Sequence, residues 1–191
     1  MDLSRIRSLP RQFINKQGTE SRMCLLAEEA RQRLVAMYLA YQPRNSFQGL
    51  PPLRDEVCAR WVQDMIRDGI NIVVFDPHGQ IDGHTGLFPI NDRKCELLVV
   101  VTPGRQNMGL GTELVRACIA AAAELGFERI CLPVAASNLR ARHVYRKCGF
   151  EYCSQSKMSR ELDMELVLPS VAPIAAPHFA LGAALDARVH G

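Results

Sequence analysis

The segment Gln106-Asn107-Met108-Gly109-Leu110-Gly111-Thr112 carries the strongest chemical signal in the sequence. It follows an apolar run typical of a buried strand and precedes a run with helical periodicity. Free backbone N–H groups at a helix start, the positive end of the helix dipole and glycines that allow close approach to the main chain together make a phosphate cradle. The segment therefore predicts an anion site, and a plain glycine-containing turn is the alternative interpretation.

Two familiar nucleotide-binding motifs do not fit this segment. A P-loop is excluded because no Gly-Lys-Ser/Thr follows the glycines. A dinucleotide-binding fingerprint is disfavoured because the glycines are not spaced as G-x-G-x-x-G. The chemistry of the segment therefore has to be judged from the elements that position it.

Those elements are predicted to form a sheet with one crossover. Apolar runs at 70–75, 81–90 and 95–101, separated by turn residues, predict an antiparallel meander. Apolar residues at helical spacing over 110–125 predict a helix, and 129–134 reads as a further strand. Because strand, glycine loop, helix and strand make a crossover unit, the strands at 95–101 and 129–134 are expected to be parallel.

The other elements complete an α+β fold with a mixed, mostly antiparallel central sheet flanked by helices. The predicted strands lie at 22–26, 150–153 and 162–168, and the predicted helices at 30–42, 53–68 and 138–147. In the second of these helices, Leu53, Val57, Trp61 and Met65 recur every four residues. This stripe is expected to be its buried face.

Length and composition indicate one globular domain between two peripheral segments. The 191 residues, 48% of them hydrophobic, can bury a core of their own, and a net charge of +3 is too small to keep the chain expanded. Residues 1–20 are expected to be a basic arm that is loosely structured or packs late. Residues 21–168 would form the domain, and residues 169–191, rich in Ala and Pro, a flexible or peripheral tail.

Charge and residue spacing also exclude several classes of function. A charge of +3 without a clustered basic face does not indicate nucleic-acid binding. No apolar run approaches the roughly 18 to 20 residues of a membrane helix, so no membrane partner and a cytoplasmic location are expected. The seven cysteines lack metal-site or paired spacing and are interpreted as small buried hydrophobes, with Cys148 or Cys153 as a reactive nucleophile the minor alternative.

The glycine segment resembles the signature of the GCN5-related N-acetyltransferase (GNAT) family. That signature is Gln/Arg-x-x-Gly-x-Gly/Ala after the fourth strand, and residues 106–111 match it at every fixed position. A second segment, SNLRARHVYRKCGF at 137–150, is similar to the family's S-N-x-x-A-x-x-x-Y-x-x-x-G-F. The resemblance extends over residues 22–168 and leaves both termini outside.

The resemblance implies that acetyl-CoA binds as the acyl donor and that no metal is needed. The diphosphate would lie on backbone amides of the glycine segment. The pantetheine would pair like an extra strand with the end of the 95–101 strand, and the second matched segment would line its other side. The implied cofactor-binding residues are Val99, Val100, Val101, Gln106, Asn107, Met108, Gly109, Leu110, Gly111, Thr112, Asn138 and Ala141.

The same resemblance implies that Tyr145 is the general acid. A departing thiolate has a conjugate acid with a pKa of about 8.5, and a phenol with a pKa near 10 can supply a proton or a hydrogen bond. A core aromatic on a short helix is the alternative interpretation of Tyr145.

A base is also needed, because an ammonium with a pKa of about 10 must lose a proton before it can attack. Many family members place a glutamate on the fourth or fifth strand, and the fifth-strand position is Pro133 here. Glu96, the one carboxylate in the central strand, is the remaining candidate, acting through a bound water. A solvated or ion-paired Glu96 explains the sequence as well, and Asp82 and His84 are alternative bases.

Basic side chains near the two matched segments could meet the 3′-phosphate of CoA or simply form a solvated surface. They are Arg105, Arg140, Arg142, Arg146 and Lys147. By analogy with the family, residues 41–53 would form the acceptor site, where Tyr41, Arg44 and Phe47 could shape the pocket.

The expected function is acetyl-CoA-dependent N-acetyl transfer to a primary amine by direct attack in a ternary complex. The acceptor would be a small molecule or a peptide, and a homodimer is compatible with the sequence. A non-catalytic acyl-CoA-binding module and a transferase for a longer acyl chain are the alternatives.

Overall fold

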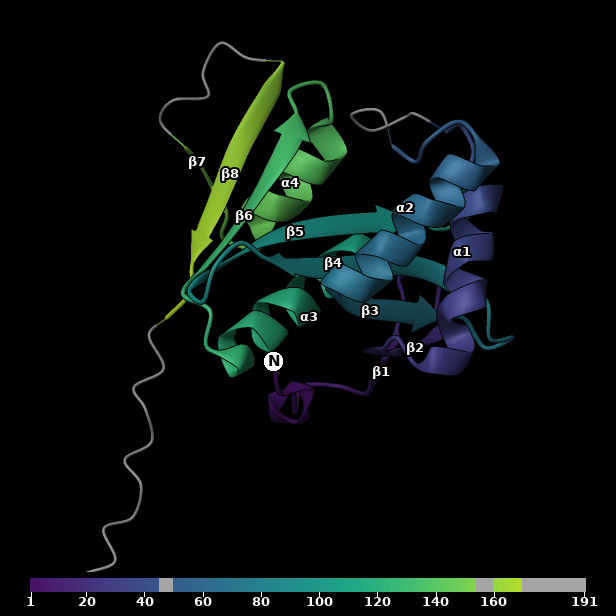
Figure 1. Ribbon diagram of the computed structural model, residues 1–191, viewed down its shortest axis with the longest axis horizontal. Coiled ribbons are helices and arrows are strands. Elements are labelled where there is room, and N and C mark those ends of the chain that lie inside the picture. The colour runs from purple at the N-terminus through teal and green to yellow at the C-terminus, as the bar shows by residue number, and fades with distance from the viewer. Residues whose placement is uncertain (45–49, 154–159, 170–191) are drawn as a thin grey trace, which may run out of the picture.

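An eight-stranded sheet forms the centre of the computed structural model, which describes residues 1–44, 50–153 and 160–169. The strands are β1 (Arg11–Ile14), β2 (Glu20–Leu25), β3 (Ile70–Phe75), β4 (Ile81–Pro89), β5 (Lys94–Val101), β6 (Arg129–Ala135), β7 (Glu151–Tyr152) and β8 (Glu161–Val167). Their order in the sheet is β1-β2-β3-β4-β5-β6-β8-β7 (Figure 1). Only the β5–β6 pair is parallel, so the predicted α+β class with one parallel crossover is confirmed.

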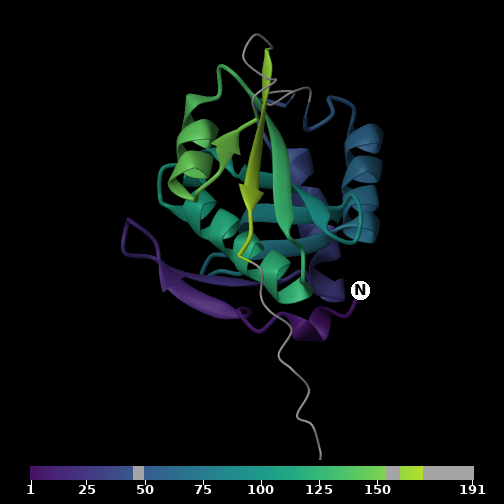
Figure 2. The same ribbon diagram turned by 90° about the vertical axis from the view of Figure 1, so that its left-hand side faces the viewer.

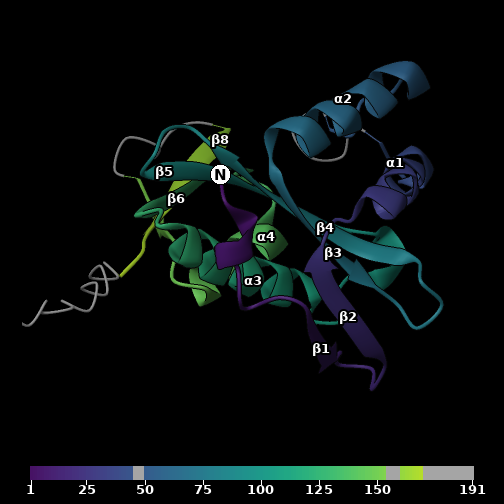
Figure 3. The same ribbon diagram turned by 60° about the horizontal axis from the view of Figure 1, so that its bottom comes forward.

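Helices cover both faces of this sheet. They are α1 (Arg31–Ala40), α2 (Asp55–Asp68), α3 (Leu110–Leu125) and α4 (Leu139–Lys147), with short 3-10 helices η1 (Leu3–Arg5), η2 (Glu28–Ala30) and η3 (Pro103–Arg105). Figure 3 shows α1 and α2 on one face and α3 and α4 on the other. None of the helices in the described ranges is long and apolar enough to cross a membrane.

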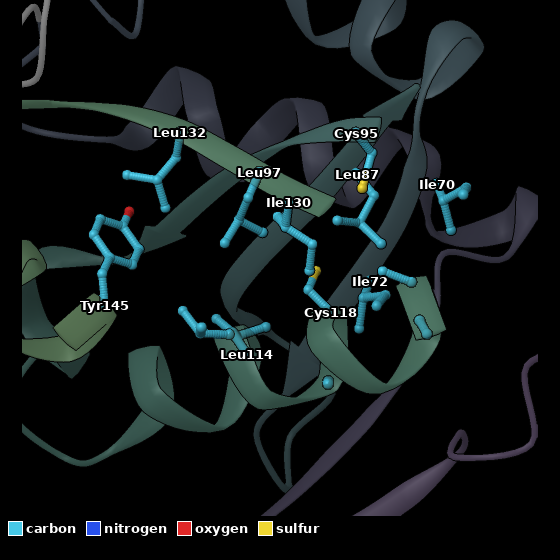
Figure 4. Packing of buried hydrophobic residues seen from close by; sticks show 14 of the residues in the cluster. Ile70, Ile72, Leu87, Cys95, Leu97, Leu114, Cys118, Ile130, Leu132 and Tyr145 are labelled. Carbon is cyan, nitrogen blue, oxygen red and sulfur yellow. The ribbon is translucent and has the colours of Figure 1, made fainter. Parts of the chain in front are cut away.

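Strand alternation divides the buried residues into two clusters, one on each face. On β3, Val73 and Phe75 pack against α1 and α2, whereas Ile72 and Val74 pack on the α3 side. On β5, Val100 belongs to the cluster on the α1 and α2 side, which we call the first cluster. Leu97 belongs to the cluster on the α3 side, the second cluster. Figure 4 shows the second cluster, where Leu97 lies above the side chains of α3.

Strands β5 and β6 diverge after a short common stretch. Their parallel pairing covers only Lys94–Glu96 against Arg129–Cys131. Beyond it, β5 remains paired with β4 up to Val101, and β6 remains paired with β8 along its full length. Figure 2 shows β6 and β8 running together across the direction of the other strands. Among the described residues, no strand pairs with the β6-facing edge of β5 from Leu97 to Val101.

The buried face of α2 agrees with the predicted one at Trp61 and Met65 but not at its start. Leu53 precedes the helix and is exposed, and Val57 is exposed as well, whereas Cys58, Val62 and Met65 are buried. A strict spacing of four residues turns about 40° too far at each step of a helix with 3.6 residues per turn. A stripe at that spacing therefore follows the buried face over only part of the helix, and the true face combines spacings of three and four.

The first 20 residues are not the loosely structured arm that was expected. β1 pairs with β2, and Ile6 and Leu9 are buried in the core. The guanidinium of Arg5 donates to the Leu125 carbonyl at 3.3 Å, and that of Arg11 donates to Glu113. The N-terminal segment therefore runs along α3 and adds a strand to the sheet. Of the predicted tail, only Pro169 lies within the described residues.

A buried polar chain connects α1, β3 and β4. The Asn71 amide donates to the carbonyls of Met65 and Gly69, so its oxygen faces Nε2 of His84 at 2.9 Å. That oxygen can only accept, so Nε2 carries the proton and Nδ1 accepts from the Tyr38 hydroxyl at 2.8 Å. His84 is fully buried, and burial lowers its pKa to about 3.

This burial makes stability depend on pH. Because the folded protein holds His84 neutral while the unfolded chain titrates near 6.5, the stabilisation is complete above about pH 6.5 and is lost as pH falls towards 3. We expect His84 to account for a loss of about 1.4 kcal/mol in the free energy of unfolding between pH 7.5 and pH 5.5.

Urea unfolding at both pH values checks this. His84→Gln should be less stable at pH 7.5 but should lose less between the two pH values, and His78→Gln, at an exposed turn, should behave like the wild type. An equal pH dependence in His84→Gln and wild type would contradict the assignment.

Candidate functional site

A cavity of about 900 Å³ lies where β5 and β6 diverge. Its walls are the β5 residues 96–101, Pro133 and Val134 of β6, much of the glycine segment and most of residues 137–147 of the second matched segment. All the predicted cofactor-binding residues line it except Met108 and Leu110. The side chains of these two are buried in the core, so only their backbone groups can take part in an anion site.

The glycine segment presents uncapped N–H groups to this cavity. Asn107 and Gly109 both have a left-handed backbone conformation, with φ of 64° and 89°. Glycine adopts this conformation without strain. Gly109 is the N-cap of α3, and no side chain caps the helix. The backbone N–H groups of the first turn are thus available to a ligand at the positive end of a long helix. An anion such as a diphosphate fits this arrangement.

Gln106 joins three elements at the same place. Its amide nitrogen donates to the Val101 carbonyl at 3.3 Å, and its amide oxygen accepts from the Arg140 guanidinium at 2.7 Å. The end of β5, the glycine segment and α4 are therefore held together by one side chain.

The charge on the cavity wall is mainly positive. Lys16, Arg105, Arg140 and Lys147 line it, and Glu96 is the one carboxylate among the lining residues that the structure describes. This excess of cations suits an anionic ligand.

The predicted basic residues divide into two groups. Arg105, Arg140 and Lys147 face the cavity, whereas Arg142 and Arg146 are absent from its walls. Arg142 instead donates to the Ala136 carbonyl at 2.7 Å and to the Tyr152 hydroxyl at 2.8 Å. Sequence reasoning missed Lys16, because a residue far from both motifs reaches the site only through the pairing of the N-terminal strands.

Tyr145 reaches the cavity from the last turn of α4. The Asn138 carboxamide begins this helix by accepting from the Ala141 N–H at 3.1 Å, and the Tyr145 ring lies 5.8 Å from that of Phe150. Figure 4 shows the hydroxyl directed towards the strands that carry Leu132 and Leu97. Burial raises the pKa of Tyr145 to about 12, so its hydroxyl keeps its proton at neutral pH.

Glu96 lies where β5 and β6 begin to diverge. It is the last β5 residue paired with β6, opposite Cys131, and its side chain is exposed. Strand alternation puts Glu96 on the face of Leu98 and Val100, towards α1 and α2. No described cation forms an ion pair with it. Glu96 and Tyr145 therefore line one cavity from opposite faces of the sheet.

The structure does not support His84 or Asp82 as the base. Both ring nitrogens of His84 are engaged in the buried chain, and its lowered pKa keeps it from taking up a proton at neutral pH. Asp82 accepts from the Arg105 guanidinium at 3.0 Å and is absent from the cavity walls. Burial raises the pKa of Asp82, with Arg105 opposing that shift. Neither group lines the cavity, and both are engaged by other side chains.

The predicted acceptor region contributes Tyr41 and Leu50 to the cavity. Arg44 donates to the Leu53 carbonyl at 3.0 Å and pairs with Asp55, so it ties the region to the start of α2. Phe47 lies outside the described residues.

The cysteines give no support to a reactive thiol. Neither Cys148 nor Cys153 lines the cavity, and burial raises the pKa of Cys148. Burial also raises the pKa of Cys95 and of Cys118 to about 12. In the described part of the chain, no group of three or more His, Cys, Asp or Glu side chains is arranged to hold a metal ion.

Comparison with known proteins agrees with this geometry. The family model "Acetyltransferase (GNAT) family" matches residues 34–150, more than half of the chain. A search of curated proteins gives no match. Among solved structures, the GNAT domain of PAT from S. lividans is similar with a TM-score of 0.72 at 17% identity, covering 83% of this chain and 97% of that one.

Two further structures share the fold. A spermidine N-acetyltransferase from Vibrio cholerae, in complex with CoA and spermine, has a TM-score of 0.62 at 19% identity over 77% of this chain and 95% of that one. A putative acetyltransferase from Acinetobacter baylyi has a TM-score of 0.64 at 18% identity over 80% and 94%. With the family match and the shared fold, the chain belongs to the acetyltransferase (GNAT) family and is an acyltransferase.

Proposed function

We propose that this acyltransferase moves an acetyl group from acetyl-CoA to a primary amine by direct attack in a ternary complex. The observation that carries the proposal is the free edge of β5. It runs along the cavity from the only lining carboxylate described, Glu96, to the uncapped start of α3, and Tyr145 faces the same space.

Acetyl-CoA fits these walls by its chemistry. The edge of β5 at Val99–Val101, which no described strand pairs with, suits the amides of the pantetheine arm, as an added strand would pair with a sheet edge. The Val101 carbonyl on β5 already accepts from the Gln106 amide. The N–H groups of the glycine segment suit the diphosphate. The Vibrio cholerae relative, with the same fold, is in complex with CoA, which supports the same donor here.

The reaction needs one bond to form and one to break. The amine nitrogen attacks the thioester carbonyl carbon, the carbon–sulfur bond breaks, and its electron pair leaves on sulfur as a thiolate. With a pKa of about 12, Tyr145 is a weaker acid than a thiol of about 8.5. It therefore stabilises the thiolate as a hydrogen-bond donor more than by handing over its proton.

Glu96 acts on the amine in this proposal. The acceptor arrives as an ammonium and must give up a proton before its lone pair can attack. A carboxylate at the point where the strands diverge attracts the ammonium and, through a bound water, receives that proton. The second proton of the nitrogen leaves to solvent after the attack.

A non-catalytic acyl-CoA-binding protein is the second candidate. The observation in its favour is Pro133, which lines the cavity at the fifth-strand position where many relatives carry a glutamate. Such a protein would bind the cofactor without releasing thiol.

Two measurements on the wild type separate these functions. CoA and acetyl-CoA should each raise the melting temperature by several degrees, since a hundredfold excess over Kd stabilises the folded state by about 2.7 kcal/mol. A panel of primary amines should then release thiol from acetyl-CoA. Binding without thiol release would favour the non-catalytic protein, and no melting shift would reject acyl-CoA binding altogether.

Tyr145→Phe should lower kcat by about a hundredfold while leaving the Kd for CoA unchanged, because only the hydroxyl that stabilises the leaving thiolate is lost. Tyr152→Phe, on an exposed tyrosine outside the cavity, is the matched control. With its pKa of about 12, Tyr145 should cause no fall in the wild-type rate between about pH 8 and pH 10. Normal turnover in Tyr145→Phe would remove the tyrosine from the mechanism.

Glu96→Gln should lower kcat/KM for the amine at least about tenfold, with an unchanged melting shift in CoA, because the carboxamide neither attracts nor deprotonates an ammonium. The deficit should shrink at high pH, where the free amine is abundant. Steady-state rates against pH test this, with Glu151→Gln as the exposed control. A rate equal to wild type at neutral pH would show that Glu96 is not the base.

A further inference from the structure

The tip of the β1–β2 hairpin lies against the glycine segment. The backbone N–H of Lys16 donates to the Met108 carbonyl at 3.0 Å. The stem of the Lys16 side chain lies on Gly109, where an added Cβ would meet its Cγ, Cδ and Cε at 3.6 to 3.9 Å. A segment outside the family match at 34–150 thus forms part of the cavity wall at the start of α3.

The hairpin tip is held in one shape. The buried Asn15 side chain accepts from the N–H groups of Gln17 and Thr19 at 2.9 and 3.1 Å. Gly18 closes the turn with φ of 80° and donates its N–H to the Asn15 carbonyl. Further back, Arg11 pairs with Glu113 in the first turn of α3. The position of Lys16 is therefore fixed from both sides.

Lys16 also differs from the two arginines of the cavity. Arg105 is shared between Asp76 and Asp82, and Arg140 is bonded to Gln106. The Lys16 ammonium is exposed, and no described carboxylate pairs with it. The stem of the side chain places the ammonium beside the uncapped N–H groups of α3. Because the side chain is flexible, the ammonium can move to contact an anion bound there.

We propose that Lys16 is a ligand-binding residue that supplies a positive charge to the diphosphate of the acyl-CoA substrate. The inference rests on the proposed function, and it assigns to the N-terminal hairpin a role in binding. The backbone N–H groups hold the diphosphate by directional hydrogen bonds. The Lys16 ammonium adds a full positive charge, which the backbone of the glycine segment lacks. The hairpin thereby favours CoA esters over acyl donors without a diphosphate.

A series of ligands tests this. Lys16→Gln should raise the Kd for CoA and for 3′-dephospho-CoA equally, by about fivefold, as expected for an exposed charge worth up to about 1 kcal/mol. The variant should keep wild-type kcat/KM with S-acetylpantetheine, which lacks the diphosphate. Lys16→Arg should restore CoA binding, and the Lys16→Gln defect should shrink between about 0.05 M and about 0.5 M salt.

Two control variants separate charge and shape effects. Gln17→Ala alters the same hairpin tip, and Arg54→Gln removes an exposed charge outside the cavity. Both should bind CoA like the wild type.

Three results would overturn the proposal alone, with wild-type CoA binding intact. The first is equal affinity of Lys16→Gln and wild type for CoA. The second is a defect that disappears with 3′-dephospho-CoA, which would assign Lys16 to the 3′-phosphate. The third is an equal loss of activity with S-acetylpantetheine, which would make the hairpin purely structural. A wild-type protein that binds no CoA at all would instead reject the proposed function and this inference together.

Discussion

The short parallel pairing of β5 with β6 is the constraint on which the site depends. β6 is held along its length by β8, and β5 is held up to Val101 by β4, so the two halves of the sheet part after Glu96. The parting leaves backbone groups of β5 without a strand partner and opens the sheet from one face to the other. Glu96 and Tyr145 can line the same cavity only because of this opening.

Each face of the opened sheet is stabilised in its own way. On the α1 and α2 face, the chain of Tyr38, His84 and Asn71 fixes the helices by hydrogen bonds that are fully buried. On the other face, an apolar cluster carries α3 and α4. Buried polar groups need hydrogen-bond partners, and closely packed apolar side chains resist changes in packing. Movement of the helices on either face would therefore cost free energy, so both faces hold the cavity walls in place.

The N-terminal segment connects the distant parts of this arrangement. It contacts the last turn of α3 through Arg5, the first turn through Arg11 and the glycine segment through Lys16. Because these contacts follow the length of one helix, they fix the position of the hairpin relative to the glycine segment. The segment therefore belongs to the site as well as to the sheet.

The sequence alone determined the elements of the crossover and their order, because periodicity, turn residues and the two motifs are local properties. It also placed Tyr145, Glu96 and the glycine segment on the elements that line the cavity. Tertiary structure decided the buried face of α2, the neutral state of His84 and the arrival of Lys16 at the start of α3. These depend on which remote segments pack together, and pairing between residues far apart in the chain leaves no periodic trace in the sequence.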